Sequence, residues 1–280
     1  MSTRQISENN EEIVKNALKE DLGRGDITGE LLLPPDLPAK AAIIAKDEGV
    51  IAGLELARKV FLAVSSQIHF ENLVSDGSRV KPGDILARLE GVARGILSGE
   101  RVALNFLQHL SGIATLTARF VDAVKPYPVK ILDTRKTLPG LRLWEKYAVR
   151  MGGAFNHRLG LYDGILIKEN YVRLCGGIRE AVGKIRQQAP QLISIEVEAL
   201  DLSQVKEALE AGVEIILLDN FSIKEIAPAV QIVQGKALLE VSGGINLANV
   251  REIAATGVNF ISIGQLTHSA PALDISLEVI

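Results

Sequence analysis

The sequence predicts an α/β protein, in which an open (incomplete) parallel α/β barrel follows an N-terminal α+β sandwich domain. From residue 129 onward, six short apolar runs alternate with segments of helical period. A repeat of strand and then helix requires parallel strands joined by right-handed crossovers. Before that point, strand-like and helical segments follow one another without this alternation. Six strands fall short of the eight of a closed barrel, so we expect an open one.

The predicted barrel strands are short apolar runs. They are Val129–Leu132, Gly164–Ile167, Leu192–Val197, Glu214–Leu218, Ala237–Val241 and Phe260–Ile263. Helix signals lie between the later strands. Asp201 with Gln204 has the spacing of a capping box, and so has Ser222 with Glu225. Gly212 stands where a helix C-cap belongs.

The N-terminal part shows a different pattern. Ala41–Ile51 and Ser78–Glu90 are strand-like, the second with a turn at Lys81-Pro82-Gly83-Asp84, and Leu54–Val64 has a helical pattern. A long helix from Leu97 to Val121, interrupted at Ser111-Gly112, then leads into the barrel. We therefore expect an N-terminal domain of residues 1–115 with its linking helix, and a barrel domain of residues 116–280. The last strand is a candidate to return to the N-terminal domain.

Composition and charge exclude several classes of protein. With 280 residues, 47% of them hydrophobic, the chain can bury a large core. A pI near 5.9 argues against a nucleic-acid-binding surface. No apolar run approaches the roughly 20 residues needed to cross a bilayer. Met1–Glu12 is polar and the only cysteine is Cys175, so we expect no signal peptide, no internal disulfide and a cytoplasmic location.

Positive side chains follow two of the predicted strands. Arg135, Lys136 and Arg142 come after the strand that ends at Leu132. Asn156-His157-Arg158 follows about one helix later, and Lys168 ends the next apolar run. The net charge is −3, so this grouping does not reflect a basic composition. Because sites form at strand ends in α/β proteins, the pattern indicates a small, multiply charged anionic ligand.

Carboxylates follow two further strands. Alternation along Ile193–Glu198 puts Glu196 and Glu198 on one face, with Glu198 nearer the carboxyl end. Asp219 follows the next strand in the same manner. Acidic groups at neighbouring strand ends suit Mg²⁺ held partly by protein and partly by a substrate phosphate. Glu196 could instead be the structural partner of an inward-facing cation.

Glycines follow the last two strands. Ser242-Gly243-Gly244 comes after the strand that ends at Val241, and Gly264 comes after the strand that ends at Ile263. Glycines there let backbone N–H groups approach a phosphate, and the loops after the final strands of such barrels commonly bind one. A Gly-Gly pair alone is more often a tight turn.

The chain resembles the quinolinate phosphoribosyltransferase family, also called nicotinate-nucleotide pyrophosphorylase (carboxylating), over nearly its whole length. The segments that carry the resemblance, in order, are Glu20-Asp21-Leu22-Gly23-Arg24-Gly25-Asp26, Glu100-Arg101-Val102-Ala103-Leu104-Asn105, Ser111-Gly112-Ile113-Ala114-Thr115, Asp133-Thr134-Arg135-Lys136-Thr137, His157-Arg158, Ile195-Glu196-Val197-Glu198, Leu218-Asp219-Asn220 and Ser242-Gly243-Gly244.

The resemblance implies a homodimer of two-domain subunits that converts quinolinate and phosphoribosyl pyrophosphate into nicotinate mononucleotide, pyrophosphate and CO₂, as a step of NAD biosynthesis. It implies that Arg101 reaches the neighbouring subunit's barrel. It implies that quinolinate meets Arg101, Arg135, His157, Arg158 and Lys168, with Thr134 and Lys136 beside them. It implies that phosphoribosyl pyrophosphate and Mg²⁺ meet Glu198 and Asp219, that Ser242, Gly243, Gly244 and Gly264 hold phosphate, and that the catalytic residues are Lys136, Lys168, Glu198 and Asp219.

Three alternatives remain open at the level of sequence. A related phosphoribosyltransferase could act on nicotinate or another anionic heterocycle. A lyase could form a Schiff base on Lys168. A non-catalytic anion-binding protein is disfavoured, because two carboxylates facing a phosphate loop would repel the ligand unless a metal were present. His157 could transfer a proton or only orient a substrate carboxylate.

Overall fold

The computed structural model describes residues 3–190 and 193–280, and the chain forms two compact units. The first unit comprises Met1–Ala118, Leu138–Gly153 and Ser269–Ile280, and the second comprises Arg119–Thr137 and Ala154–His268. Each unit therefore combines separate stretches of the sequence. In the described part of the chain, no helix has both the length and the apolar character that a membrane span needs.

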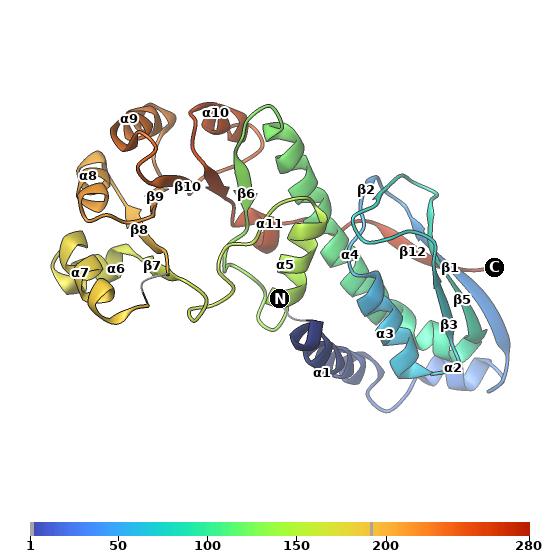
Figure 1. Cartoon of the computed structure of the whole chain (residues 1–280). Coiled ribbons are helices and arrows are strands. Elements are labelled where there is room, and N and C mark those ends of the chain that lie inside the picture. The colour runs from blue at the N-terminus through green and yellow to red at the C-terminus, as the bar shows by residue number, and fades with distance from the viewer. Residues whose placement is uncertain (1–2, 191–192) are drawn as a thin grey trace. The chain divides into compact units, whose positions relative to one another are not determined.

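The first unit is built on an antiparallel sheet (Figure 1). Its elements are α1 (Thr3–Leu22), α2 (Ile27–Leu32), β1 (Pro38–Ala45), β2 (Gly49–Val50), α3 (Leu54–Val64), β3 (His69–Asn72), β4 (Arg79–Val80), β5 (Ile85–Val92), most of α4 (Ala93–Val124), α5 (Arg142–Met151) and β12 (Ile275–Val279). The strand order is β12-β1-β5-β3, and Ala41 of β1 faces Val279 on one side and Leu89 on the other. Helix α3 buries its apolar stripe, and the rings of Phe61 and Phe70 pack 5.8 Å apart.

The second unit is a parallel sheet with helices between successive strands. Its elements are β6 (Lys130–Leu132), β7 (Ile165–Ile167), α6 (Glu169–Cys175), α7 (Ile178–Gln188), β8 (Ile195–Ala199), α8 (Leu202–Glu210), β9 (Ile215–Asp219), α9 (Ile223–Val233), β10 (Leu238–Ser242), α10 (Val250–Ala255), β11 (Phe260–Ser262) and α11 (Gln265–His268). In Figure 1, helices α6 to α10 lie outside strands β7 to β10. The strand order is β6-β11-β10-β9-β8-β7, so β6 and β7 are the two edges and the barrel is open.

The predicted fold class is confirmed. All six predicted barrel strands form, with ends displaced by up to three residues. Residue 192, where one of them was expected to begin, lies outside the described residues, and β8 starts at Ile195. Helix α3 has the predicted bounds. The expected strand Ala41–Ile51 is divided between β1 and β2, and Ser78–Glu90 is divided between β4 and β5 by the predicted turn, where Gly83 has φ +92°.

The prediction that Ser111-Gly112 interrupts the long helix is wrong. Helix α4 is continuous from Ala93 to Val124. The small residues serve close packing instead. A side chain at position 112 would overlap the backbone at Pro271, and the Ser111 hydroxyl accepts the Ala52 N–H at 3.0 Å. Glycine disfavours a helix but does not stop one that tertiary packing supports.

The two predicted capping boxes have different outcomes. Ser222 and Glu225 form the complete box at the start of α9. At the start of α8, the Asp201 carboxylate accepts the Gln204 N–H at 2.8 Å as expected, but the Gln204 side chain accepts from Leu200 N–H at 2.9 Å rather than from Asp201. Gly212, with φ +71°, follows the end of α8 as predicted.

Candidate active site

The register of the parallel sheet gathers polar side chains on one face near the carboxyl ends of its strands. Facing residues of paired strands project to the same side, as do residues two apart in one strand. Glu198 of β8 and Glu240 of β10 both face Leu217 of β9, and Ser242 faces Asp219. Glu198, Asp219, Glu240 and Ser242 therefore share one face. This is where the sequence predicted the carboxylates and the phosphate loop to lie together.

The two cationic segments of the second unit are tied to each other by Asp133. This buried residue follows β6, and its carboxylate accepts the His157 N–H at 2.8 Å and the Asn156 side-chain N–H at 2.6 Å. The loop after Asp133 carries Arg135 and Lys136, and the segment after Asn156 carries Arg158. The hydrogen bonds fix one segment against the other, which explains how side chains some 20 residues apart can act on one ligand.

Arg135 and Arg158 lie close enough for their charges to interact. Partial burial lowers the pKa of Arg158, and the charge of Arg135 lowers it further, while Glu196 opposes both effects. The Nε of Arg135 is buried and has no hydrogen-bond partner among the described residues. Arg158 Nη1 donates to the Gly164 carbonyl at 3.0 Å. Two partly buried guanidinium groups, one with an unused donor, form a site suited to a carboxylate.

Thr134 and Lys136 lie in the same loop. The Thr134 hydroxyl accepts the Lys136 N–H at 3.0 Å, and the Thr267 hydroxyl donates to the Lys136 carbonyl at 2.7 Å. The exposed Lys136 side chain passes over Gly264, because a Cβ there would lie 2.9 Å from Lys136 Cδ. Gly264 therefore serves the close approach of a lysine stem, a role that the sequence did not suggest.

The start of helix α6 holds the Glu198 carboxylate, at the residue next to Lys168. Lys168 is the exposed N-cap residue of that helix, and the next N–H, of Glu169, donates to Glu198 Oε2 at 3.1 Å. Glu198 is 9% exposed. The backbone bond orients the carboxylate through its Oε2 atom.

Asp219 and the glycine loop are connected by Asn220. The Asn220 amide donates to Asp219 Oδ2 at 2.9 Å, and the Asn220 N–H donates to the Ser242 carbonyl at 2.9 Å. Gly243 has φ +92°, and a Cβ at this position would overlap the Asn220 amide oxygen. Gly244 also has a positive φ, +63°. Glycine is thus required at position 243 by both conformation and space.

Glu198 and Asp219 fit the Mg²⁺ that the sequence predicted. Both are carboxylates on adjacent strands and on one face of the sheet. Mg²⁺ prefers oxygen ligands and usually takes only one or two carboxylates, with phosphate and water completing its shell. The donor chemistry of this pair therefore suits a magnesium ion shared with a phosphorylated substrate.

Arg101 and Arg142 belong to the first unit. Arg101 lies in α4, its side chain is 60% exposed, and its Nη2 is 3.9 Å from Glu100 Oε1. Arg142 begins α5. The sequence had grouped Arg142 with Arg135 and Lys136, which are part of the second unit.

Sequence reasoning missed Glu240. It lies in the predicted strand Ala237–Val241, is 2% exposed, and its Oε1 is 3.6 Å from His157 Nε2. The signal was present in the sequence. A glutamate inside an apolar strand is costly to bury and therefore requires a partner.

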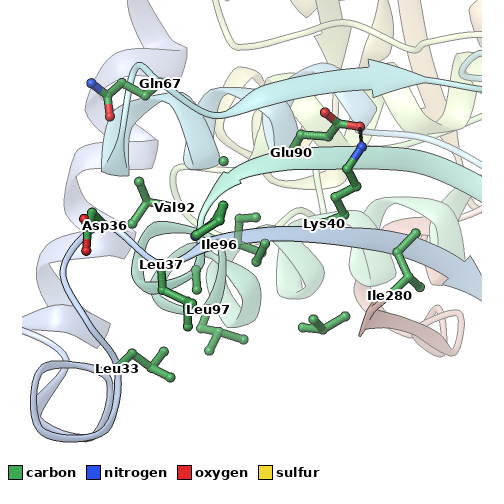
Figure 2. A pocket seen from close by; sticks show the side chains of 15 residues that line it. Leu33, Asp36, Leu37, Lys40, Gln67, Glu90, Val92, Ile96, Leu97 and Ile280 are labelled. Atoms are coloured by element: carbon green, nitrogen blue, oxygen red, sulfur yellow. Dashed lines mark hydrogen bonds and ion pairs between the residues drawn. The ribbon is translucent and has the colours of Figure 1, made fainter.

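A hollow of about 710 Å³ lies in the first unit (Figure 2). Its lining is mostly apolar, including Leu37, Ile96 and Leu97, and it also contains the ion pair between Lys40 and Glu90, 2.6 Å long. The predicted site residues do not line it. All the residues that line it belong to the first unit.

Two family descriptions together match nearly the whole chain. Residues 26–111 match "Quinolinate phosphoribosyl transferase, N-terminal domain", and residues 113–278 match "Quinolinate phosphoribosyl transferase, C-terminal domain". The second match alone covers more than half of the chain and includes the carboxyl ends of the parallel strands.

Individual relatives agree with this assignment. The chain is 44% identical to the "Probable nicotinate-nucleotide pyrophosphorylase [carboxylating]" of Bacillus subtilis (strain 168), over 93% of this chain and 90% of that protein. It is 44% identical to the "Nicotinate-nucleotide pyrophosphorylase [carboxylating]" of Mycobacterium leprae (strain TN), over 95% of each. The structure of the nicotinate-nucleotide pyrophosphorylase from Francisella tularensis superposes with a TM-score of 0.94 at 42% identity, over 98% of this chain and 96% of that one. The chain belongs to the quinolinate phosphoribosyltransferase family.

Proposed function

We propose that this chain transfers the phosphoribosyl group of phosphoribosyl pyrophosphate to quinolinate with decarboxylation, giving nicotinate mononucleotide, pyrophosphate and CO₂ in NAD biosynthesis. Membership of the family supports this activity. The single structural observation that carries it is the pair Arg135 and Arg158: the charge of Arg135 disfavours that of Arg158, and the buried Nε of Arg135 has no hydrogen-bond partner in the described part of the chain. A dianionic substrate relieves both the repulsion and the unsatisfied donor.

Quinolinate has two adjacent carboxylates, and the proposed site has cations for both. The guanidinium groups of Arg135 and Arg158 bind carboxylate through parallel N–H donors, and Lys168 adds a third charge from the start of α6. Thr134 and Lys136 lie in the loop beside them. Binding through several fixed donors orients the pyridine ring so that its nitrogen points at the sugar.

The chemistry needs no covalent enzyme intermediate. The pyridine nitrogen attacks C1 of the ribosyl group while the bond from C1 to pyrophosphate breaks, so the ring nitrogen becomes cationic. The bond from the ring to the neighbouring carboxylate then breaks, CO₂ leaves, and the electron pair enters the cationic ring before a proton takes the vacated position. The enzyme's contribution is orientation and charge complementarity.

The phosphate-bearing substrate is assigned to the other strand ends. Ser242, Gly243, Gly244 and Gly264 would hold phosphate oxygens through backbone N–H groups and a hydroxyl. Glu198 and Asp219 would hold Mg²⁺, which when bound supplies positive charge against the pyrophosphate. Lys136, beside Gly264, adds a cation on the same side.

We further propose that the enzyme is a homodimer in the cytoplasm, with Arg101 contributed across the interface. In the isolated chain, Arg101 is exposed and has only a 3.9 Å contact with Glu100. An arginine on a long helix with so weak a local partner is available to a neighbouring subunit's ligand. The single cysteine, Cys175, suits a reducing compartment.

Pyrophosphate and CO₂ release, assayed over a panel of pyridine carboxylates, tests the activity. We expect quinolinate to exceed nicotinate in kcat/KM by roughly 10⁴-fold, because the missing carboxylate leaves buried cations unpaired. Comparable efficiency on both acids would contradict the proposal. Borohydride treatment with substrate is the control for the lyase alternative, and a covalent adduct on Lys168 would favour that alternative.

The magnesium assignment is tested by Glu198→Gln and Asp219→Asn. Each variant should lose most activity with phosphoribosyl pyrophosphate at limiting Mg²⁺, while quinolinate binding in calorimetry remains measurable. Normal activity at limiting Mg²⁺ in either variant would refute the assignment.

The shared site is tested by mixing two inactive variants. Arg101→Ala and Glu198→Ala should each be inactive alone, but a mixed dimer contains one intact site if Arg101 acts across the interface. Unfolding and refolding equal amounts together gives about half mixed dimers and so about a quarter of wild-type activity. Each variant refolded alone is the control. Absence of recovery, with mixed dimers demonstrated, would place Arg101 in its own subunit's site.

A further inference from the structure

His157, Glu196 and Glu240 form a buried cluster in the second unit. His157 Nε2 is 3.1 Å from Glu196 Oε2 and 3.6 Å from Glu240 Oε1. Glu196 is 5% exposed and Glu240 is 2% exposed. Both carboxylates lie on the face of the sheet that carries Glu198, because Glu196 is two residues before it and Glu240 faces the same residue, Leu217.

The second ring nitrogen of His157 determines its tautomer. Nδ1 accepts the backbone N–H of Arg158 at 2.7 Å. A ring nitrogen that accepts a hydrogen bond carries no proton, so the proton of the neutral ring is on Nε2 and points at the two carboxylates. Both nitrogens are thus engaged by protein groups. Nε2 has no lone pair to offer a metal ion, although its distance to the two carboxylates would otherwise permit one.

His157 also fixes the residue that follows it. The Arg158 N–H is held by the His157 ring, and its guanidinium Nη1 is held by the Gly164 carbonyl at 3.0 Å. The His157 N–H is held by Asp133 at 2.8 Å. The position of Arg158 therefore depends on the ring of His157, and the orientation of that ring depends on what faces Nε2.

We propose that Glu240 is a positioning residue for the reaction: with Glu196 it holds His157 in the Nε2–H form, and His157 in turn holds Arg158 against a carboxylate of quinolinate. This inference rests on the proposed function. It assigns no proton transfer to His157, which acts through its two fixed hydrogen bonds.

The electrostatics of the cluster agree with this role. Burial, and then the negative charge of Glu196, raise the pKa of Glu240 to about 7, while His157 and the Ser262 hydroxyl oppose the rise. Near neutral pH, Glu240 therefore carries a proton for part of the time and can donate it to Glu196. A glutamine at this position would keep that donor, whereas an apolar side chain would leave Glu196 without it.

The test uses Glu240→Leu and Glu240→Gln, with Glu214→Leu as the matched control. Glu214 immediately precedes β9, so it lies at the amino end of that strand and not at the carboxyl end where Asp219 lies. There it accepts the Ile195 N–H at 2.7 Å and pairs with Arg186 at 2.6 Å. Quinolinate affinity is measured by calorimetry in the absence of phosphoribosyl pyrophosphate, and KM is measured for each substrate. A ¹⁵N spectrum, with His157 identified through His157→Asn, reports the ring tautomer directly.

We expect Glu240→Leu to weaken quinolinate binding about tenfold, because Glu196 loses the neighbouring carboxyl group that helps to keep it against His157. The KM of phosphoribosyl pyrophosphate should stay within about twofold of wild type. Glu240→Gln should restore quinolinate binding to within about twofold of wild type. Glu214→Leu should lower the melting temperature and leave quinolinate affinity unchanged. The spectrum of wild type should show Nε2 protonated and Nδ1 not.

Three results would overturn the inference: equal losses for both substrates in Glu240→Leu, an equal loss of quinolinate affinity in Glu214→Leu, or a wild-type His157 protonated on Nδ1. If the leucine variant does not fold, the glutamine variant and the spectrum still decide the question. If wild type neither binds quinolinate nor releases pyrophosphate, the proposed function fails, whereas the tautomer of His157 remains a separate observation on the cluster.

Discussion

Each unit contains a histidine paired with a buried glutamate, and the two pairs differ in how their hydrogen bonds are completed. In the first unit, the fully buried Glu145 accepts from His109 Nε2 at 2.9 Å and from the Leu138 N–H at 3.2 Å, so each carboxylate oxygen has a partner. In the second unit, Glu196 Oε2 accepts from His157, but Glu196 Oε1 is buried without a hydrogen-bond partner among the described residues.

The difference agrees with a purely structural role for the first pair and with the binding site proposed around the second. Glu145 joins the loop before α5 to helix α4, and nothing further is needed to satisfy it. The hydrogen bonds around Glu196 are incomplete: Glu240 Oε1 and Arg135 Nε are also buried without hydrogen-bond partners in the described part of the chain. Native proteins keep few such groups, and those that remain commonly mark sites where a ligand or a shared proton completes the network.

The largest expected effect tests the incomplete network. Arg158→Met keeps the apolar stem but removes the charge, so we expect kcat/KM for quinolinate to fall about 10³-fold, or about 4 kcal/mol. The unfolding free energy of the ligand-free protein should not fall, because burial and Arg135 already disfavour this charge. Kinetics and urea unfolding measure the two quantities. Arg186→Met, which breaks an ion pair with Glu214 away from the strand ends, is the control and should keep normal kinetics.

The pair of His109 and Glu145 should show the opposite result, a loss of stability with unchanged quinolinate binding. Glu145→Leu leaves His109 Nε2 and the Leu138 N–H without their acceptor, so we expect a loss of roughly 2–4 kcal/mol of unfolding free energy. Quinolinate affinity should stay within about twofold of wild type. Urea unfolding at fixed protein concentration and calorimetry check this, with Glu145→Gln, which retains one acceptor, expected to lose about half as much. A large loss of affinity with unchanged stability would remove the contrast between the pairs.

The pH dependence of the unfolding free energy tests whether Glu240 is protonated in the folded protein. Its pKa in the folded protein, about 7, lies above the ordinary value of 4.5. Its contribution to stability is therefore complete below pH 4.5 and is lost as the pH rises through 7. Relative to Glu240→Gln, wild type should lose up to about 3 kcal/mol of unfolding free energy between pH 4.5 and 8. The difference between the two proteins cancels the groups that titrate in both and do not interact with Glu240. A difference independent of pH would show that Glu240 ionises normally.

The smallest expected effect concerns an exposed hydrogen bond of the second unit that lies at the start of a helix. Asp201→Ala removes the acceptor of the Gln204 N–H at the start of α8, which should cost about 1 kcal/mol and leave the kinetics of both substrates unchanged. Asp201→Asn keeps an acceptor and should lose only a few tenths of that. If Asp201→Ala altered quinolinate kinetics, the loss of kcat/KM in Arg158→Met would not be specific evidence for a site at the carboxyl ends of the strands.

Much of the second unit could be predicted from local signals. Apolar runs, capping boxes and glycines at turns act within a few residues, so they indicate where each strand and helix lies. The signals also implied that Glu198, Asp219 and Ser242 would meet, because parallel strands end at a common edge. The first unit was less predictable, since its strands pair across long separations, as β1 does with β12.

By itself, the sequence determined the type and order of the barrel elements, the family, and which strand ends carry charge. Only the tertiary structure decided that Ser111 and Gly112 pack a continuous helix, that α5 joins the first unit, and that Glu240 comes within 3.6 Å of His157. These outcomes depend on groups distant in sequence that approach within a few ångströms. Periodicity and propensity describe neighbours along the chain, whereas burial and hydrogen bonding are properties of neighbours in space.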